Sequence, residues 1–316
     1  MKKIIYVLLA ICIMSTILFG CSKDNNDNDI ANNNVFENYS ESDNNPTQET
    51  IYIDSGVVDY ENVKFEYDGK PLEFDYKYNC TADCEIGFQL FVNGILQEFT
   101  VNNEKYNLYK VNCKANTDEI FHVSFTPNNG NKGESASLIF ANIYNPEIIE
   151  FKGEVNTFGN YHKISQPMPW GIKMNVDANQ KSFAISSDYD EHKFTQEELN
   201  EFIKIKEDGS KTNILDERMF FDTSKEIERI SKKDENTLTF NLNGNLEGKY
   251  RISLYGDFEQ VSINGNNYID IDVKKNTQYS ISIQIEEIEN YKNVYAVAVA
   301  LDNAEGLIKS NSYYIE

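Results

Sequence analysis

The sequence predicts an all-β protein built from two β-sandwich domains of the immunoglobulin-like kind. Apolar and polar residues alternate in many short runs, which is the pattern of half-buried strands. Asn-Gly dipeptides at 93–94 and 264–265 lie between such runs and mark hairpin turns, because both central positions of a type I′ turn need a positive φ. A helical period occurs only in one short segment near residues 195–205.

We assign the first sandwich to residues 51–163. Its strand-like runs are residues 63–67, 72–78, 86–90, 95–101, 109–113, 121–125, 137–143 and 148–155. About eight short strands at regular spacing, with turn residues between them, are typical of a β-sandwich.

A proline-containing segment separates the two predicted domains. Pro167 and Pro169 remove backbone donors and favour an extended chain. Trp170, the single tryptophan, follows them directly. We expect its side chain to pack at the contact between the domains or in the second core.

Residues 164–316 form the second predicted sandwich, which carries a short helical insertion. Thr195 and Glu198 match a capping box, and apolar residues extend the predicted helix to about Ile205. The segment 294–301 is apolar throughout, so we expect a strand that is buried on both faces. The other strand-like runs are residues 238–242, 250–254, 261–263, 269–273 and 279–285.

Residues 21–50 are rich in Asn and Asp and contain too few apolar side chains to form a core. Ordering such a segment costs conformational entropy without hydrophobic gain, so we predict a disordered tether. A flexible chain of this length averages about 30 Å end to end.

The first 20 residues have the organisation of an export signal. Two lysines precede an apolar run that ends at Gly20, directly before Cys21. This arrangement resembles the lipobox signal peptide of bacterial lipoproteins, although Phe19 stands where a small residue is commoner. The resemblance implies cleavage after residue 20 and a diacylglycerol on the thiol of Cys21. The abundant Asn, Lys and Ile suggest an AT-rich genome, as in clostridial Gram-positive bacteria.

Two other outcomes for this segment stay open, namely an uncleaved membrane anchor and cleavage without lipidation. A membrane-spanning helix needs about 20 apolar residues, and this run is slightly shorter. All three outcomes place the rest of the chain outside the cytoplasm. With the lipid on Cys21, the protein is expected on the outer face of the cell membrane.

The charge balance is strongly acidic, with 51 Asp and Glu against 29 Lys and Arg and a net charge of −22. Such a surface repels nucleic acid and anionic lipid headgroups. We therefore expect no direct binding to nucleic acid.

Three cysteines, Cys80, Cys84 and Cys113, lie in the first predicted domain. Export permits disulfides, and an odd number leaves at least one thiol free. Cys80 and Cys84 bracket a three-residue segment that can turn, and Cys113 is a candidate partner for either. The spacing lacks the second cysteine pair or histidines that a structural zinc site needs.

Asp188, Asp190 and Glu191 are candidate calcium ligands, because calcium prefers carboxylate oxygens. An acidic surface loop without a metal is the simpler interpretation in so acidic a chain. The three histidines are scattered, and His122 lies on the polar side of its predicted strand.

No nucleophile elbow, P-loop or zinc-protease motif is present, and no cofactor motif was found. We therefore expect a non-catalytic surface protein whose loops at 128–134 and 187–192 bind a partner. Candidate partners are cell-wall polymer, glycan or another surface protein. The alternative is a membrane-anchored extracellular hydrolase, a glycosidase or peptidase, whose active-site residues are far apart in sequence.

Overall fold

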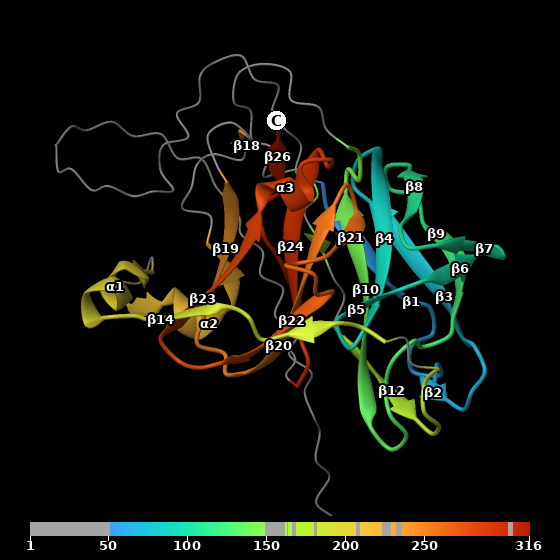
Figure 1. The fold of residues 1–316 in the computed structure, drawn as a ribbon. Helices are drawn as coiled ribbons and strands as arrows, with labels where there is room; N and C mark the ends of the chain where they lie inside the picture. The colour runs from blue at the N-terminus through green and yellow to red at the C-terminus, as the bar shows by residue number, and fades with distance from the viewer. Residues whose placement is uncertain are drawn as a thin grey trace, which may run out of the picture. The chain divides into compact units, whose positions relative to one another are not determined.

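The structure confirms an all-β fold with two β-sandwiches (Figure 1). It is a computed structural model that describes residues 51–148, 162, 164–165, 169–179, 182–206, 209–222, 229–231, 236–302 and 306–316. Residues 49–316 form one compact unit. The predicted signal segment with Cys21, the predicted tether and most of the predicted strand at 148–155 lie outside the described residues.

Two sheets face each other in the first sandwich. Sheet 1 contains, in spatial order, β1 (Ile53–Val57), β3 (Leu72–Cys80), β9 (Glu119–Phe125), β6 (Phe99–Val101) and β7 (Glu104–Tyr106). Sheet 2 contains β2 (Glu66–Tyr67), β12 (Trp170–Met174), β10 (Ser135–Tyr144), β4 (Cys84–Val92) and β5 (Ile95–Gln97), with β11 (Ile164–Ser165) on β10 and β8 (Tyr109–Cys113) on β4. The β2–β12 pair is parallel, and the other pairs of this sandwich are antiparallel.

The second sandwich also consists of two sheets. Sheet 3 contains β13 (Ile185–Ser186), β22 (Tyr268–Val273), β20 (Gly248–Gly256), β24 (Asn293–Ala300), β26 (Tyr313–Ile315) and β18 (Arg229–Ile230), with β21 (Glu259–Val261) on β20 and β25 (Leu307–Lys309) on β24. Sheet 4 contains β14 (Asp190–Lys193), β23 (Thr277–Gln284), β19 (Thr237–Asn243) and β17 (Phe220–Phe221). A separate hairpin pairs β15 (Ile203–Ile205) with β16 (Lys211–Asn213).

One short helix was expected in the second sandwich, and the described residues of this sandwich contain two further short helices. The three helices are α1 (Gln196–Glu201), α2 (Ile214–Glu217) and α3 (Ile285–Ile288). The predicted capping box of α1 is present, because Glu198 accepts a hydrogen bond from the backbone amide of Thr195 at 2.7 Å and the Thr195 hydroxyl accepts from the Glu198 amide at 3.3 Å. The predicted extension to Ile205 is wrong. Alternation of β-branched isoleucines with Lys204 favours a strand there, and β15 forms.

Strand β3 shows how the alternating pattern builds the first core. Its sequence LEFDYKYNC has every second side chain buried against sheet 2, beginning with Leu72 and ending with Cys80. Tyr76 lies at the centre of this core, where its ring contacts Phe140 edge-on at a centroid distance of 4.7 Å. The interior is therefore built largely from aromatic side chains, and each of them supplies a large area of buried apolar surface.

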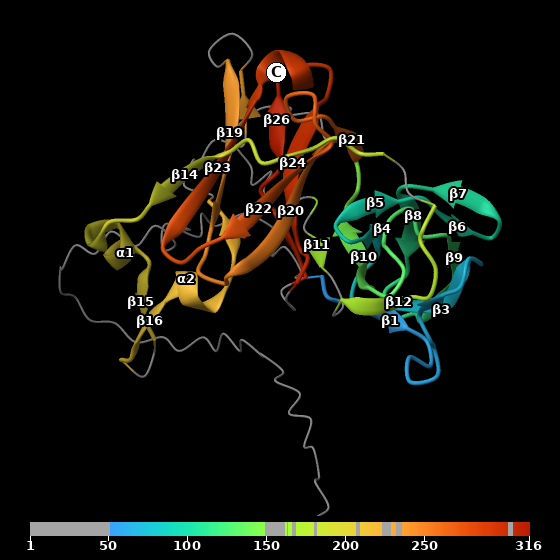
Figure 2. The same cartoon turned by 60° about the horizontal axis from the view of Figure 1, so that its bottom comes forward.

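The two sandwiches pack against each other through sheets 2 and 3. Outward-facing apolar side chains from both sheets form one buried cluster, called here the central interface, which comprises Phe91, Ile139, Ala141, Ile143, Tyr255, Phe258, Tyr295, Val297, Val299 and Leu307. The four sheets therefore follow one another as layers in the order 1, 2, 3, 4, which Figures 1 and 2 show from two directions. Strand β24 faces sheet 4 on one side and sheet 2 on the other, which confirms the prediction for residues 294–301.

The chain passes from sheet 2 to sheet 1 after the hairpin that contains the first Asn-Gly turn. Asn93 and Gly94 have φ values of 48° and 72°, so the predicted type I′ geometry is confirmed. Strand β5 returns along β4, and after Glu98 the chain continues as β6, which pairs with β9. The consecutive strands β5 and β6 therefore connect the two sheets along one edge of the first sandwich.

The second Asn-Gly turn does not join two paired strands, and that prediction is wrong. Asn264 and Gly265 do have positive φ values, 50° and 78°. However, β21 and β22 both pair with β20, and the turn closes only the single bridge between Ile263 and Asn266. The long β20 strand offers a partner to both segments, so the residues between them loop out.

Strands β11 and β12 belong to the first sandwich, which therefore continues beyond the expected boundary at residue 164. β12 pairs with β10 and β2, and Trp170 packs in the first core with its ring 5.7 Å from Phe65 and 6.2 Å from Phe74. The expectation that Trp170 lies at the domain contact or in the second core is wrong. The alternating pattern of residues 170–174 fits the free edge of β10, and the prolines before it only extend the connection.

Candidate functional site

The structure brings the three cysteines of the first sandwich together at one end of its core. Cys80 ends β3, Cys84 begins β4, and Cys113 ends β8. Cys84 and Cys113 are direct partners in the antiparallel β4–β8 pair. Cys80 packs in the same core as the other two cysteines, and both of them influence the pKa of its thiol. We call these residues the thiol cluster, and all of its members are free thiols.

The members of the thiol cluster differ in burial. Cys80 and Cys113 are buried, whereas Cys84 is half-buried. Burial raises the pKa of the Cys80 thiol well above its ordinary range, and the neighbouring thiols raise it further. Burial also raises the pKa of Cys84, and the charge of Asp83 adds to this, while a hydrogen bond with Cys80 opposes it. Since the thiolate is the reactive form, the raised pKa values of Cys80 and Cys84 mean that these two thiols react more readily as the pH rises.

The three candidate calcium ligands are not brought together. Asp190 and Glu191 are neighbours in β14, where successive side chains point to opposite faces of the strand. Glu191 pairs instead with Lys274 at 2.9 Å, and Asp188 precedes the strand. In the part of the chain that the structure describes, no group of three or more His, Cys, Asp or Glu side chains could hold a metal ion.

Two of the histidines are exposed and lie beside carboxylates. His122 on β9 faces solvent, as predicted, with its Nδ1 2.8 Å from Asp75. His192 on β14 lies 2.9 Å from Glu198, which connects the strand to the capping box of α1. Both contacts are surface pairs, which contribute little to stability.

His162 is different, because it is fully buried beside the central interface. Its Nε2 lies 2.7 Å from the carbonyl oxygen of Glu147 and its Nδ1 3.0 Å from the hydroxyl of Ser312. The ring contacts Phe258 edge-on at a centroid distance of 4.7 Å. Burial is the largest cause that lowers the pKa of His162, to about 4, and nearby Lys309 adds to it. No local pattern in the sequence marks this histidine as buried.

The loops that were expected to contact a partner are only partly available. In the loop at 128–134, Asn128 and Asn129 are buried, and the Asn129 amide donates to the carbonyl of Val92 at 2.9 Å. The residues from Asn131 to Glu134 are exposed. In the loop at 187–192, the last three residues belong to β14 and pair with β23.

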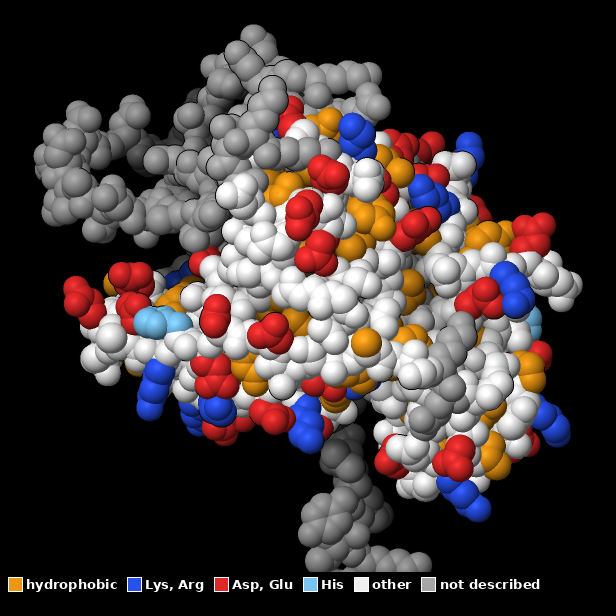
Figure 3. Space-filling model, in the orientation of Figure 1, with side chains coloured by type: hydrophobic (Ala, Val, Ile, Leu, Met, Phe, Trp, Pro, Cys, Tyr) orange, Lys and Arg blue, Asp and Glu red, His pale blue; other side chains and the backbone are white. Residues whose placement is uncertain are grey.

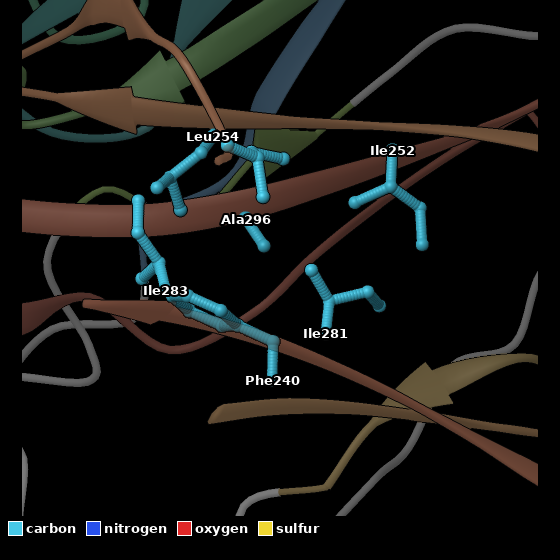
Figure 4. A pocket seen from close by; sticks show the side chains of 7 residues that line it. Phe240, Ile252, Leu254, Ile281, Ile283 and Ala296 are labelled. Atoms are coloured by element: carbon cyan, nitrogen blue, oxygen red, sulfur yellow. The ribbon is translucent and has the colours of Figure 1, made fainter. Parts of the chain in front are cut away.

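A cavity lies within the second core (Figure 4). Its walls are entirely apolar and are formed by Phe240, Ile252, Leu254, Ile263, Ile281, Ile283 and Ala296. A reaction site needs polar or charged groups that converge on the substrate. This cavity offers none, so it is a packing feature of the core.

The surface carries carboxylates that are spread out and mixed with basic side chains on the face drawn in Figure 3. Two tyrosines of the first sandwich are exposed, Tyr52 at 65% and Tyr60 at 54%, and the ring of Tyr60 lies 6.3 Å from that of Trp170. In the described ranges, no helix is long and apolar enough to cross a membrane.

Comparisons with known proteins show no family. No protein-family model matches the chain, and no curated protein matches it. A chain of a 1.5-MDa bacterial ice-binding adhesin matches 84% of this chain at 10% identity and a TM-score of 0.20, and this chain spans 65% of that one. Red sea bream transglutaminase matches 84% at 7% identity and a TM-score of 0.22, with 31% of its own chain covered. The CsuC–CsuE chaperone and tip-adhesion complex of Acinetobacter baumannii pili matches 83% at 14% identity and a TM-score of 0.18, with 98% of its chain covered. At these TM-scores the likeness carries no inference about function.

Proposed function

We propose that this chain is a non-catalytic binding protein that a lipid on Cys21 holds at the outer face of a bacterial membrane. The sequence of residues 1–21 supports a lipid anchor, because its apolar run ends in Gly20-Cys21, as in a lipoprotein signal peptide. Two acyl chains on one cysteine suffice for stable anchoring. The strongly acidic composition supports a partner that is neither nucleic acid nor an anionic lipid surface.

The central interface is the observation that carries the binding role. Ten buried apolar side chains join sheets 2 and 3, so the two sandwiches move as one body. A rigid body presents its loops in fixed positions, which reduces the entropy lost when a partner binds. The exposed part of the loop at 131–134, together with Tyr60, supplies polar and aromatic groups of the kind found in binding surfaces.

The anchor is tested by metabolic labelling of the full chain with a palmitate analogue in a Gram-positive host. We expect label in the wild type and its loss in Cys21→Ala, with release of the variant from the membrane fraction. Cys12→Ala is the matched control, because Cys12 lies inside the apolar run and should not affect labelling. Equal labelling of both variants would refute the anchor.

The binding role is tested with residues 49–316, the compact unit. Purified cell-wall polymer and an array of defined glycans are incubated with the immobilised unit. We expect saturable binding without any change in the mass of the bound polymer or glycan. Products released from either substrate would instead identify a hydrolase.

A further inference from the structure

The thiol cluster forms a site that the proposed binding role does not use. Cys84 and Cys113 are directly opposite each other in an antiparallel strand pair. Residues in such positions have Cα atoms about 4.5 or 5.5 Å apart. Both separations lie within the range of about 4.4–6.8 Å that disulfides span. These two cysteines can therefore be joined without movement of the backbone.

The direction of the two side chains agrees with this. Cys84 shares its parity with Ile86 and Phe88, which point into the first core, and Cys113 packs in that same core. Both sulfur atoms thus lie on the same face of sheet 2, which a cross-strand disulfide requires. Cys80 approaches them from sheet 1, on the opposite side of the core.

The three thiols differ in how easily a reagent in solvent reaches them. Cys84 is the half-buried member, whereas Cys80 and Cys113 are buried. A reagent from solvent therefore reaches Cys84 first, and Cys113 is its immediate neighbour.

We propose that Cys84 and Cys113 are a thiol–disulfide exchange site, at which an external disulfide oxidises the pair while Cys80 remains a buried thiol. The Cys84 thiolate attacks one sulfur of the external disulfide, so that a mixed disulfide forms and one thiolate leaves. The Cys113 thiolate then attacks the Cys84 sulfur and expels the second thiolate. The protons of Cys84 and Cys113 end on the two released thiols, so two protein thiols are oxidised and one external disulfide is reduced.

The position of Cys80 explains why it stays out of the bridge. Cys80 is fully buried in the core, so a reagent in solvent does not reach its thiol. Cys80 also belongs to the opposite sheet, whereas the strand register places Cys113 directly across from Cys84, so Cys113 is the thiol positioned to complete the bridge. The bridge that we propose fastens β8 to β4 and so closes a loop around the β5, β6 and β7 strands.

The test treats residues 49–316 with oxidised glutathione at mildly alkaline pH and maps the peptides by mass spectrometry without reduction. We expect the loss of two thiols per chain, a Cys84–Cys113 peptide pair and an unmodified Cys80. Cys80→Ser should form the same bridge at a similar rate. Cys84→Ser should lose thiols at least about tenfold more slowly, because it lacks the attacking thiol. Cys113→Ser should lose one thiol and stop at a glutathione adduct on Cys84, because the second thiol that resolves the mixed disulfide is absent.

The melting temperature supplies a second readout. We expect oxidation to raise it by several degrees in the wild type and in Cys80→Ser, with full reversal by dithiothreitol. Melting under reducing conditions shows whether each serine variant is folded. A bridge that contains Cys80 in the folded wild type, a lasting glutathione adduct on Cys84 or no bridge at all would each overturn the proposal.

Discussion

Arg251 of the second sandwich donates a hydrogen bond from Nη1 to the carbonyl oxygen of Asn93 in the first, at 3.0 Å. The same guanidinium makes two contacts of 2.7 Å with the carboxylate of Asp270, which fix its plane. Only 12% of the Arg251 side chain is exposed. The type I′ turn of the first sandwich thus accepts a hydrogen bond from a charged side chain of the second sandwich.

Replacement of Arg251 by alanine should lower the free energy of unfolding of residues 49–316 by about 2 kcal/mol, because it removes hydrogen bonds to a charged group and to a buried turn. Asp270 is 38% exposed, so solvent screens part of the loss. Lys249→Ala, on the same strand but exposed, is the control and should change stability by less than about 0.5 kcal/mol. Urea unfolding checks both variants, and equal effects would contradict the role of Arg251.

The two Asn-Gly turns offer a matched pair of substitutions. Gly94 and Gly265 have positive φ values of 72° and 78°, so alanine is strained at either position. A Cβ at Gly94 would lie 3.1 Å from the Cβ of Arg251 and 3.2 Å from that of Val299, whereas one at Gly265 would meet nothing within 4 Å. We expect Gly265→Ala to cost about 1 kcal/mol and Gly94→Ala about 2–3 kcal/mol, measured by urea unfolding.

The difference between the losses in free energy of unfolding of these two variants measures how closely the sandwiches pack at the turn that contains Gly94. Equal losses would mean that the sandwiches move apart easily at this place.

Phe91 tests the central interface itself. Its side chain is fully buried and contacts the ring of Tyr255 edge-on at 6.3 Å across the interface. Phe91→Ala should reduce the free energy of unfolding by about 3 kcal/mol or more, because it removes apolar contacts and leaves a cavity. Ile120→Ala is the control, since Ile120 is 60% exposed. A loss for Phe91→Ala as small as that of the control would show that the two sandwiches are not held by this cluster.

His162 predicts a dependence of stability on pH. Its pKa is about 4 in the folded chain against 6.5 for an unperturbed histidine, with burial as the main cause. The unfolded chain therefore binds the proton more readily, so this contribution to stability is complete above pH 6.5 and is lost as the pH falls towards 4. The shift corresponds to about 3 kcal/mol.

The measurement compares the wild type with His162→Asn over this pH range. Asparagine tolerates the positive φ of 59° at this position, and its amide is a donor that can replace the histidine N–H. We expect the wild type to lose about 3 kcal/mol more than the variant, while the titration of the other groups cancels. Parallel losses in both proteins would rule out His162 as the cause.

Alternating patterns in the sequence were sufficient to find most strands and the fold class. Strand β3 and strand β24 have the burial that their sequences predict, because local alternation and continuous apolarity report directly which faces are covered. The capping box of α1 was found for a similar reason, since its donors and acceptors lie within four residues.

Features that depend on distant partners were not predicted. The alternation in β4 indicated one buried face, yet Gln89 and Phe91 on the other face are also buried, because sheet 3 covers them. Trp170 was assigned to the wrong core for the same reason, since only the free edge of β10 decides where β12 pairs. The second turn failed as a hairpin because both of its flanking strands pair with β20.

The thiol cluster was predicted only in part. The spacing of Cys80 and Cys84 suggested nearness, and the structure adds that Cys113 faces Cys84 across a strand pair. The register of the β4–β8 pair determines which two cysteines lie opposite each other. That register cannot be read from a single sequence.

Because four sheets are stacked, the strands of the two inner sheets are covered on both faces. Most strands of a sandwich keep one side in water, where substitutions have little effect, but β10 and β24 are enclosed on both sides over most of their length. Successive side chains of these strands enter different cores in turn, so a backbone shift that suits a substitution in one core disturbs the other. Sequence drift during evolution should accumulate on the water-facing sides of sheets 1 and 4, and new partner preferences should arise there as well.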